Sequence, residues 1–322
     1  MRPAKTNFIY ESLPATFGGQ GWQARIGSHL DDLRVGEYWR RSGVNSESAE
    51  LRAVLLFSPG SELCVKEDPN KALMLENVDL DLLRMQHRNL TSFFASRGIE
   101  VHIFSPRERL KPNLIFMRDL FFLTPHGAVL SRMAAVQRAG EERVAALALS
   151  ELAIPIIAMP RGIATVEGAD VLWLRDDCVL VGVGQRTNRE GYEFVADLLA
   201  EMDVDTIPIP MSSGTQHLLG VVNFVARDLA VVRRRKAPTE LLDALKRHGV
   251  STISLPDDED VVIRRAANFL CLGDFEIVMP ADCPTTKAVF KAHGIKVTEM
   301  DVSEYIKAGG ALGCLTGILH RG

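Results

Sequence analysis

The chain has 322 residues, 47% of them hydrophobic, and a formal net charge of −4 at pH 7. This size and apolar content allow two ordinary domains or one large symmetric domain with a sizeable core. The acidic balance gives no basic footprint for nucleic acid, and the one basic run, Arg233 to Lys236, is interpreted as a solvated hairpin end. We therefore expect a small-molecule substrate.

The N-terminus lacks the apolar core of a signal peptide, and no stretch reaches the ~18 to 20 uninterrupted apolar residues of a membrane span. We expect a soluble, cytoplasmic protein with no membrane partner. The five cysteines are odd in number and show no CxxC pair or zinc spacing, which argues against a disulfide framework and structural zinc. One thiol is therefore expected to be chemically active and four structural.

Residues 1–50 stand outside the pattern of the remaining chain. They contain QARIGSHLDDLRVGEYWRRSG, which predicts one or two short helices joined by polar loops. The sequence leaves three roles open for this extension: a cap, a lid that closes over a substrate, or a subunit contact such as that of a homodimer. Residues 51–322 are expected to form a single domain.

That domain consists of repeated units. In four of them, two apolar runs joined by a polar turn predict a β-hairpin: DLFFL-TPHG-AVLSR, DVLWL-RDD-CVLVGV, GVVNFV-ARD-LAVV and NFLCL-GD-FEIVMP. Helical spacing of apolar residues follows each hairpin, in EERVAALALSELA, EGYEFVADLLAEM, TELLDALKRHG and TTKAVFKAHG. A short run then closes each unit, and its Pro and β-branched residues suit an edge strand: IPIIAMP, TIPIPM, STISLP and KVTEM.

The first unit has RAVLLFSPG, a helical stretch from Leu75 to Arg97 and the closing run IEVHIF, but it lacks a leading strand. The C-terminal CLTGILHR can supply that strand, which would place Cys314 on it. Pairing of the last strand with the first closes a ring and removes the open edges. The sequence therefore predicts an α/β ring of five ββαβ units whose inner strands line a central site.

Reactive side chains recur at the starts of the units. These unit-start residues are Asp119 in FMRD, Glu167 in EGAD, His217 in TQHLLG and Cys314 in GGALGCLTG. They lie 48, 50 and 97 residues apart, so the last interval spans about two units and the missing fifth position falls at Ala267-Asn268. Residues placed once per repeat face the same end of a ring, which predicts one reaction centre.

The local settings agree with such a centre. The small residues around Cys314 allow close approach of a ligand, and both Glu167 and His217 begin their units after a flexible segment. Asp119 and Asp170 each precede a strongly apolar strand, where an isolated buried carboxylate is very costly. We therefore expect a cationic partner for these carboxylates, which a substrate can supply.

Together, MRD, EGAD, a His one unit later and a Cys in a Gly-rich C-terminal stretch resemble the superfamily of arginine deiminases, dimethylarginine dimethylaminohydrolases and amidinotransferases. The resemblance covers about Leu51 to Arg321 and includes VLVGVGQRTNREG, which is similar to the stretch after the second hairpin strand in the two hydrolase families. It implies the five-bladed α/β propeller, or pentein, with one catalytic domain over residues 51–322.

The resemblance further implies attack by Cys314 on the carbon of a guanidinium, with His217 as general acid and then general base. Glu167 would orient His217 or hold a substrate nitrogen. Asp119 and Asp170 would accept paired N–H groups from the guanidinium, whose planar fork matches a carboxylate. The positive charges of the substrate and the histidine would lower the pKa of the thiol.

Arg132 and Arg186 are implied as ligands of a substrate α-carboxylate, with a rim salt bridge as the competing interpretation of either. No cofactor and no metal are expected, because GVGQRTN lacks the GxGxxG spacing and neither HExxH nor a phosphate loop occurs. One departure concerns Leu219: arginine deiminases typically have an Asp two residues after the His. An apolar residue there tolerates an N-alkyl substituent and favours a substituted guanidine.

The leading expectation is a cofactor-free hydrolase of arginine or an N-substituted, arginine-like compound, which acts through an S-amidino-cysteine intermediate and yields a ureido product with ammonia or an alkylamine. An amidinotransferase shares that intermediate and passes the amidino group to an amine. A third alternative is a pentein that binds without catalysis, because a fold does not dictate function.

Overall fold

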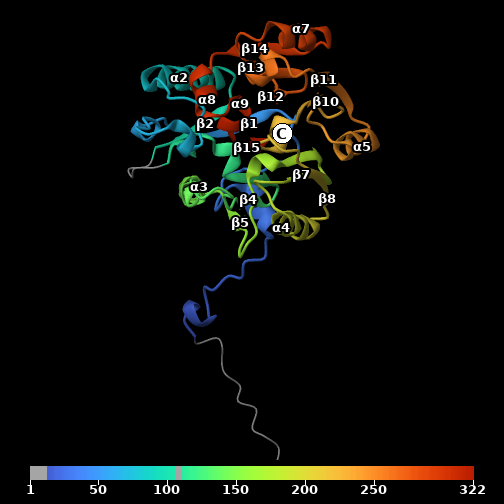
Figure 1. The fold of residues 1–322 in the computed structure, drawn as a ribbon. Coiled ribbons are helices and arrows are strands. Elements are labelled where there is room, and N and C mark those ends of the chain that lie inside the picture. The colour runs from blue at the N-terminus through green and yellow to red at the C-terminus, as the bar shows by residue number, and fades with distance from the viewer. Residues whose placement is uncertain (1–12, 106–110) are drawn as a thin grey trace, which may run out of the picture.

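The computed structural model describes residues 13–105 and 111–322, and these form five blades around a central axis (Figure 1). In each blade an inner strand pairs antiparallel with a middle strand, which pairs parallel with an outer strand. A helix connects the middle strand to the outer one. This is the predicted ββαβ order, and the fold is a five-bladed α/β propeller.

Four blades are continuous in the chain. They are β3 (Phe121–Thr124), β4 (Gly127–Leu130), α3 (Glu141–Glu151) and β5 (Ile156–Ala158); β6 (Val171–Arg175), β7 (Cys178–Val183), α4 (Arg189–Ala200) and β8 (Asp205–Pro210); β9 (Val222–Ala226), β10 (Leu229–Arg233), α5 (Thr239–Arg247) and β11 (Ser251–Leu255); β12 (Leu270–Gly273), β13 (Glu276–Pro280), α7 (Pro284–Ala292) and β14 (Lys296–Met300).

The fifth blade joins the two ends of the domain. It consists of β15 (Gly317–Arg321), β1 (Leu51–Phe57), α2 (Leu80–Ser96) and β2 (Glu100–Phe104). The last strand, β15, pairs antiparallel with β1 from Leu51↔Arg321 to Leu55↔Gly317. The predicted closure of the ring is thereby confirmed, and each outer strand forms the edge of its sheet.

The burial pattern explains why these segments form these elements. The inner strands β3, β6 and β9 are buried almost throughout, whereas the outer strands alternate or are partly exposed. The helices bury one face each: α5 places Leu241, Ala244 and Leu245 in the core at helical spacing. Gly249 ends the turn after α5 with φ +70°, a left-handed conformation that glycine adopts without a Cβ penalty.

Most inner strands follow a single helical turn at the same end of the ring. These turns are η6 (Met117–Asp119), η7 (Gly168–Asp170), η8 (Leu218–Gly220) and α9 (Leu312–Leu315). Cys314 therefore lies on α9, and the prediction that it belongs to the closing strand is wrong. The small residues permit this tight turn: a Cβ on Gly313 would come within 2.7 Å of Asn268 Oδ1.

The extension before β1 lies at the opposite end of the ring from these turns. Glu47 is buried there and accepts hydrogen bonds from Arg118 Nη2 at 2.9 and 3.0 Å and from the backbone N–H of Trp173 at 3.3 Å. One predicted short helix, α1 (His29–Val35), is present, and His29 Nε2 lies 2.7 Å from the carbonyl oxygen of His126 in the β3–β4 turn. The extension thus contacts the far end of the ring through residues such as His29 and Glu47, whereas Phe17, Trp22 and Ile26 in its earlier part are exposed.

The remaining short elements lie in the extension, within the closing blade and between blades. They are η2 (Ala15–Phe17), η3 (Ser61–Leu63), η4 (Pro69–Ala72), η5 (Pro112–Ile115), α6 (Glu259–Val262) and α8 (Ser303–Ala308). Within the described ranges, no helix combines the length and the apolar character needed to cross a bilayer.

The Glu47 contacts generate a stability prediction. Glu47→Ala leaves the buried guanidinium of Arg118 without its carboxylate, next to a second buried arginine, Arg321. Loss of one partner of a buried ion pair costs about 3 to 5 kcal/mol, so the urea midpoint of unfolding is expected to fall markedly. Glu50→Ala is the matched control, because Glu50 and its partner Arg52 are exposed, and it should change stability by no more than about 0.5 kcal/mol. Equal midpoints for the two variants would contradict this role of Glu47.

Candidate active site

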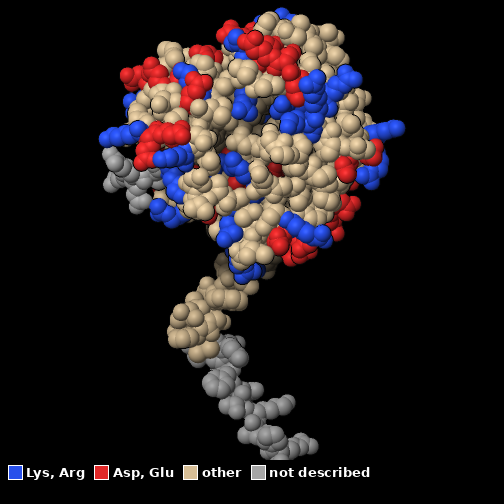
Figure 2. Space-filling model, in the orientation of Figure 1, with Lys and Arg blue, Asp and Glu red and all other residues tan. Residues whose placement is uncertain are grey.

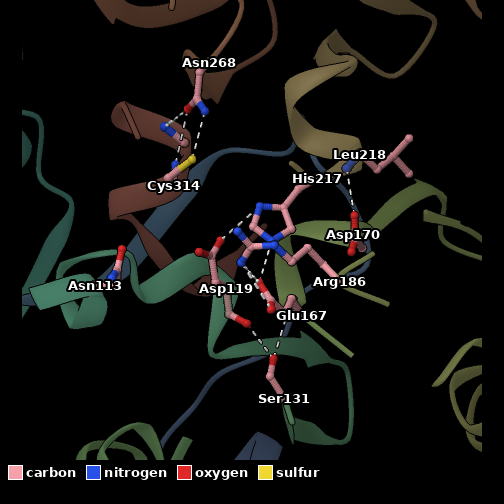
Figure 3. Close-up of polar contacts among 12 residues, drawn as sticks. Asn113, Asp119, Ser131, Glu167, Asp170, Arg186, His217, Leu218, Asn268 and Cys314 are labelled. Carbon is pink, nitrogen blue, oxygen red and sulfur yellow. Dashed lines mark hydrogen bonds and ion pairs between the residues drawn. The ribbon is translucent and has the colours of Figure 1, made fainter. Parts of the chain in front are cut away.

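The unit-start residues meet at one end of the ring, although they come from four blades (Figure 3). A pocket of about 320 Å³ opens there, and its lining includes Cys314, His217, Asn268, Leu219 and Arg186. Figure 2 shows the corresponding face hollowed near its centre, with Lys and Arg side chains beside the hollow. The volume suits a ligand of the size of an amino acid.

His217 precedes η8 and is held by two carboxylates. Its Nε2 lies 2.7 Å from Glu167 Oε2, and its Nδ1 lies 3.7 Å from Asp119 Oδ1. Burial alone would lower the pKa of this histidine. The negative charges of Asp119, Asp170 and Glu167, with the hydrogen bond to Glu167, have a larger effect and raise the pKa to about 9. The imidazole is therefore protonated at neutral pH and has a proton to donate.

Glu167 is fully buried beside that histidine. Burial alone would raise the pKa of its carboxyl, but the hydrogen bond and charge of His217, with the charges of Arg138 and Arg186, lower the pKa to about 2. Arg186 contributes through Nη1, which lies 3.1 Å from Glu167 Oε2. Glu167 is thus ionised at neutral pH and orients the histidine.

Cys314 faces this group from the other side of the site (Figure 3). Asn268 Nδ2 donates to Cys314 Sγ at 2.9 Å, while Asn268 Oδ1 accepts from the backbone N–H groups of Gly313 at 2.8 Å and Cys314 at 3.3 Å. Burial and the charge of Asp119 raise the pKa of the thiol, while the Asn268 hydrogen bond and Arg265 act in the opposite direction. The thiol of the empty site is therefore largely neutral at pH 7.

Asp119 has one oxygen satisfied and one free. Its Oδ2 accepts from Nη1 of the buried Arg138 at 2.6 Å, whereas Oδ1 is buried and has no hydrogen-bond donor among the described residues. Arg138 also donates to Glu141 at 2.8 Å and lies 3.8 Å from Glu167 Oε2. Oδ1 is therefore the oxygen of this carboxylate that could still accept an N–H group of a ligand.

Asp170 does not line the pocket. Its Oδ1 accepts from the backbone N–H of Leu218 at 2.9 Å and its Oδ2 accepts from the Thr187 hydroxyl at 2.8 Å. Burial raises its pKa to about 6. Asp170 thus fixes the start of η8, directly after His217, and its contact with a guanidinium stays a prediction.

Of the two arginines predicted to bind a substrate carboxylate, one lines the pocket and the other does not. Arg186 lines the pocket, but its guanidinium contacts Glu167. Arg132 is outside the lining and donates from Nη1 to the carbonyl oxygen of Ala164 at 3.1 Å. Arg233, interpreted as a solvated hairpin end, is instead partly buried, paired with Asp257 at 2.9 Å, and lines the pocket.

Three of these side chains also resemble a cation site. One ligand atom each from Asp119, Glu167 and His217 can be chosen so that all lie within 4.8 Å of one another. The guanidinium of Arg138 already lies within ion-pair distance of both carboxylates. The carboxylates of Asp119 and Glu167 thus already bind the guanidinium of Arg138, so their arrangement suits a guanidinium.

The roles of Arg138 and Asn268 were not predicted from the sequence. Arg138 lies in a loop with no periodic signal, and only the fold brings it to Asp119. Asn268 occupies the missing fifth unit-start position, so its placement was indicated by the repeat, but an amide is a weak signal for chemistry. The assembled site offers a thiol, a protonated imidazole and a free buried carboxylate oxygen around one pocket.

Comparisons with known proteins agree with this geometry. The arginine deiminase family model matches residues 110–239. An uncharacterized protein of Aeropyrum pernix is 30% identical over 224 residues, which cover 69% of this chain and 78% of that protein. The N(G),N(G)-dimethylarginine dimethylaminohydrolase of Pseudomonas aeruginosa is 24% identical, with 72% of this chain and 86% of the enzyme covered.

A similar solved structure is SxtG, an amidinotransferase from Microseira wollei in the saxitoxin biosynthetic pathway. It superposes with a TM-score of 0.72 at 16% identity and covers 87% of this chain and 97% of its own. At this identity the likeness concerns the fold. The chain therefore belongs to the pentein superfamily of guanidino-group-modifying enzymes, whose members are hydrolases or amidinotransferases.

Proposed function

We propose that this protein is a cysteine-dependent hydrolase of an arginine-like guanidino compound, acting through an S-amidino-cysteine intermediate. The observation that carries the proposal is the buried Oδ1 of Asp119, which accepts no hydrogen bond from the described residues and lies 3.7 Å from Nδ1 of the protonated His217. A carboxylate oxygen without a donor in a buried site calls for a cationic donor from the ligand. A guanidinium meets that need and presents its carbon to Cys314.

In the first step, the Cys314 thiol loses its proton to solvent as the substrate binds, and Sγ attacks the planar carbon of the guanidinium as a thiolate. The positive charge of the bound substrate favours this thiolate, whose formation the burial of the empty site opposes. His217 then gives a proton to the departing nitrogen of the tetrahedral adduct. The C–N bond breaks, an amine or ammonia leaves, and an amidino group remains on the sulfur.

In the second step, His217, now neutral, accepts a proton from water as the water oxygen attacks the amidino carbon. The C–S bond breaks, the thiol is regenerated and a ureido product leaves. Glu167 keeps the imidazole in position through both steps and stabilises its charged form. Asp119 holds the substrate nitrogen through Oδ1 in both steps.

Leu219 supports a substrate with an N-alkyl group. Its side chain is buried, lines the pocket and lies near Gly313, next to Cys314. An apolar wall there accommodates a methyl group and leaves a free N–H without an acceptor. An amidinotransferase is the second candidate, because an amine that enters in place of water would resolve the same intermediate, and the fold of SxtG is compatible with it.

The direct test is turnover of arginine, monomethylarginine, dimethylarginine, agmatine and guanidinoacetate, each with and without glycine or ornithine as an amine acceptor, with mass spectrometry of the ureido and amine products. We expect a ureido product without any acceptor, and Cys314→Ser should lower kcat by at least about a thousandfold. Product only in the presence of an acceptor would assign the transferase. Unchanged turnover by Cys314→Ser would refute the mechanism.

The raised thiol pKa predicts a pH dependence in the free enzyme. Because the thiolate is the minor form at pH 7, alkylation of Cys314 by iodoacetamide should accelerate about tenfold per pH unit from pH 7 to 8.5. The rate is read by peptide mass spectrometry in a Cys64→Ser background, since Cys64 is the exposed free cysteine among the described residues. A rate that is constant across this range would show that the thiolate already dominates at pH 7.

The hydrogen bond from Asn268 predicts a second effect on the same thiol. Asn268→Asp replaces the donor to Sγ by a carboxylate, which destabilises the thiolate. We expect kcat/KM at pH 7 to fall about 10- to 100-fold and the alkylation profile to move to higher pH. Asn70→Asp, at an exposed amide in η4 away from the thiol, is the control and should change neither quantity. A fall in kcat/KM without movement of the alkylation profile would exclude action through the thiol.

A further inference from the structure

The charges that line the pocket differ from those buried next to it. The pocket lining contains three arginines, Arg186, Arg233 and Arg265, and no Asp or Glu among the described residues. The carboxylates of Asp119 and Glu167 lie deeper, around His217. Figure 2 shows Lys and Arg side chains beside the hollow on this face.

Two of these arginines are already neutralised. Arg186 contacts Glu167 at 3.1 Å, and Arg233 donates from Nε and Nη2 to Asp257 at 3.0 and 2.9 Å. Arg265 is different: its side chain has no hydrogen bond or ion pair among the described residues, and its Nε is buried without a partner. A partly buried guanidinium with no acceptor is costly, so its presence in a pocket calls for an explanation.

The backbone fixes Arg265 close to the reacting group. It has φ +60°, an uncommon conformation for a residue with a side chain, and its carbonyl oxygen accepts the N–H of Asn268 at 2.8 Å. Asn268 in turn contacts Cys314 Sγ. The side chain of Arg265 is near enough to Cys314 and Arg233 for each to act on it electrostatically.

An unpaired cation here is unfavourable for a substrate that carries only positive charge. Arg265 would repel the guanidinium of such a substrate as the substrate enters the pocket. A substrate that also bears a carboxylate reverses this effect, because one end matches the free oxygen of Asp119 and the other end supplies the missing acceptor of Arg265. The unsatisfied guanidinium of Arg265 in the pocket lining and the unsatisfied oxygen of Asp119 next to it thus match the two ends of one zwitterionic molecule.

We propose that Arg265 is the specificity-determining residue that binds the carboxylate of a guanidino acid, in place of the predicted ligands Arg132 and Arg186. The inference rests on the proposed function for the guanidino end of the substrate, while the anion site itself is defined by Arg265 and its surroundings. Agmatine, which has the guanidinium without the carboxylate, is then a poor substrate.

The first test compares Arg265→Gln with the parent enzyme on methylarginine and on agmatine. We expect KM for methylarginine to rise about 10- to 100-fold with kcat changed much less, and KM for agmatine to stay within twofold or to fall. Arg235→Gln, an exposed arginine of the same basic run, is the control and should leave both substrates unaffected. Equal losses on the two substrates, or no loss on either, would overturn the proposal.

The second test does not depend on turnover. In the Cys64→Ser background, alkylation of Cys314 by anionic iodoacetate is compared with alkylation by neutral iodoacetamide. A change in the thiol pKa affects both rates equally. The rate with iodoacetate divided by the rate with iodoacetamide therefore reports the attraction of the anion alone, and Arg265→Gln should lower this ratio about fivefold or more. Arg265→Lys keeps the charge and the same backbone demand, and it should retain most of the ratio.

The two tests separate the two ideas. If no guanidino compound is turned over but the ratio falls in Arg265→Gln, the proposed hydrolase fails and the anion site stands. If the parent enzyme hydrolyses methylarginine and the ratio is the same in Arg265→Gln, the anion site fails and the hydrolase stands.

Discussion

Charge burial governs this end of the ring, where four carboxylates, those of Asp119, Glu141, Glu167 and Asp170, are almost completely removed from solvent. Arg138, Arg186 and protonated His217 balance them in part. The compensation is incomplete, because burial still raises the pKa of Asp170 to about 6 and that of Glu141 to about 7. A dry site with too few cations favours a positively charged ligand.

Much of the ring was predictable because its signals are local. Hairpins, amphipathic helices and closing strands each leave a pattern within a few residues, and the constant interval orders them around an axis. Closure by β15 and β1 followed from the missing strand of the first unit. The error at Cys314 has a physical reason: CLTG was assigned to a strand, whereas small residues allow the extra turn of α9 ahead of it.

The site was predictable only for residues whose positions repeat. Asp119, Glu167 and His217 come together as expected because each precedes an inner strand. Arg138 and Arg265 lie in loops, where direction is set by tertiary contacts, so a pattern of residue types could not place them. Asp170 lies close to Glu167 in the sequence but contacts Leu218 and Thr187. Glu167 precedes η7 with an extended backbone, whereas Asp170 ends the turn, so the two side chains have different neighbours.

The distribution of charge around the pocket favours orientation of the substrate before the thiolate forms. In the proposed reaction, Arg265 in the pocket lining attracts the carboxylate of an approaching guanidino acid, while the buried carboxylates around His217 attract its other end. Such a substrate is therefore aligned before its guanidinium reaches Cys314. Only then does a positive charge adjoin the thiol, whose pKa is raised in the empty site by burial and by Asp119. The proposed mechanism thus generates the thiolate when a correctly oriented substrate is bound, and the thiol of the empty site stays largely neutral.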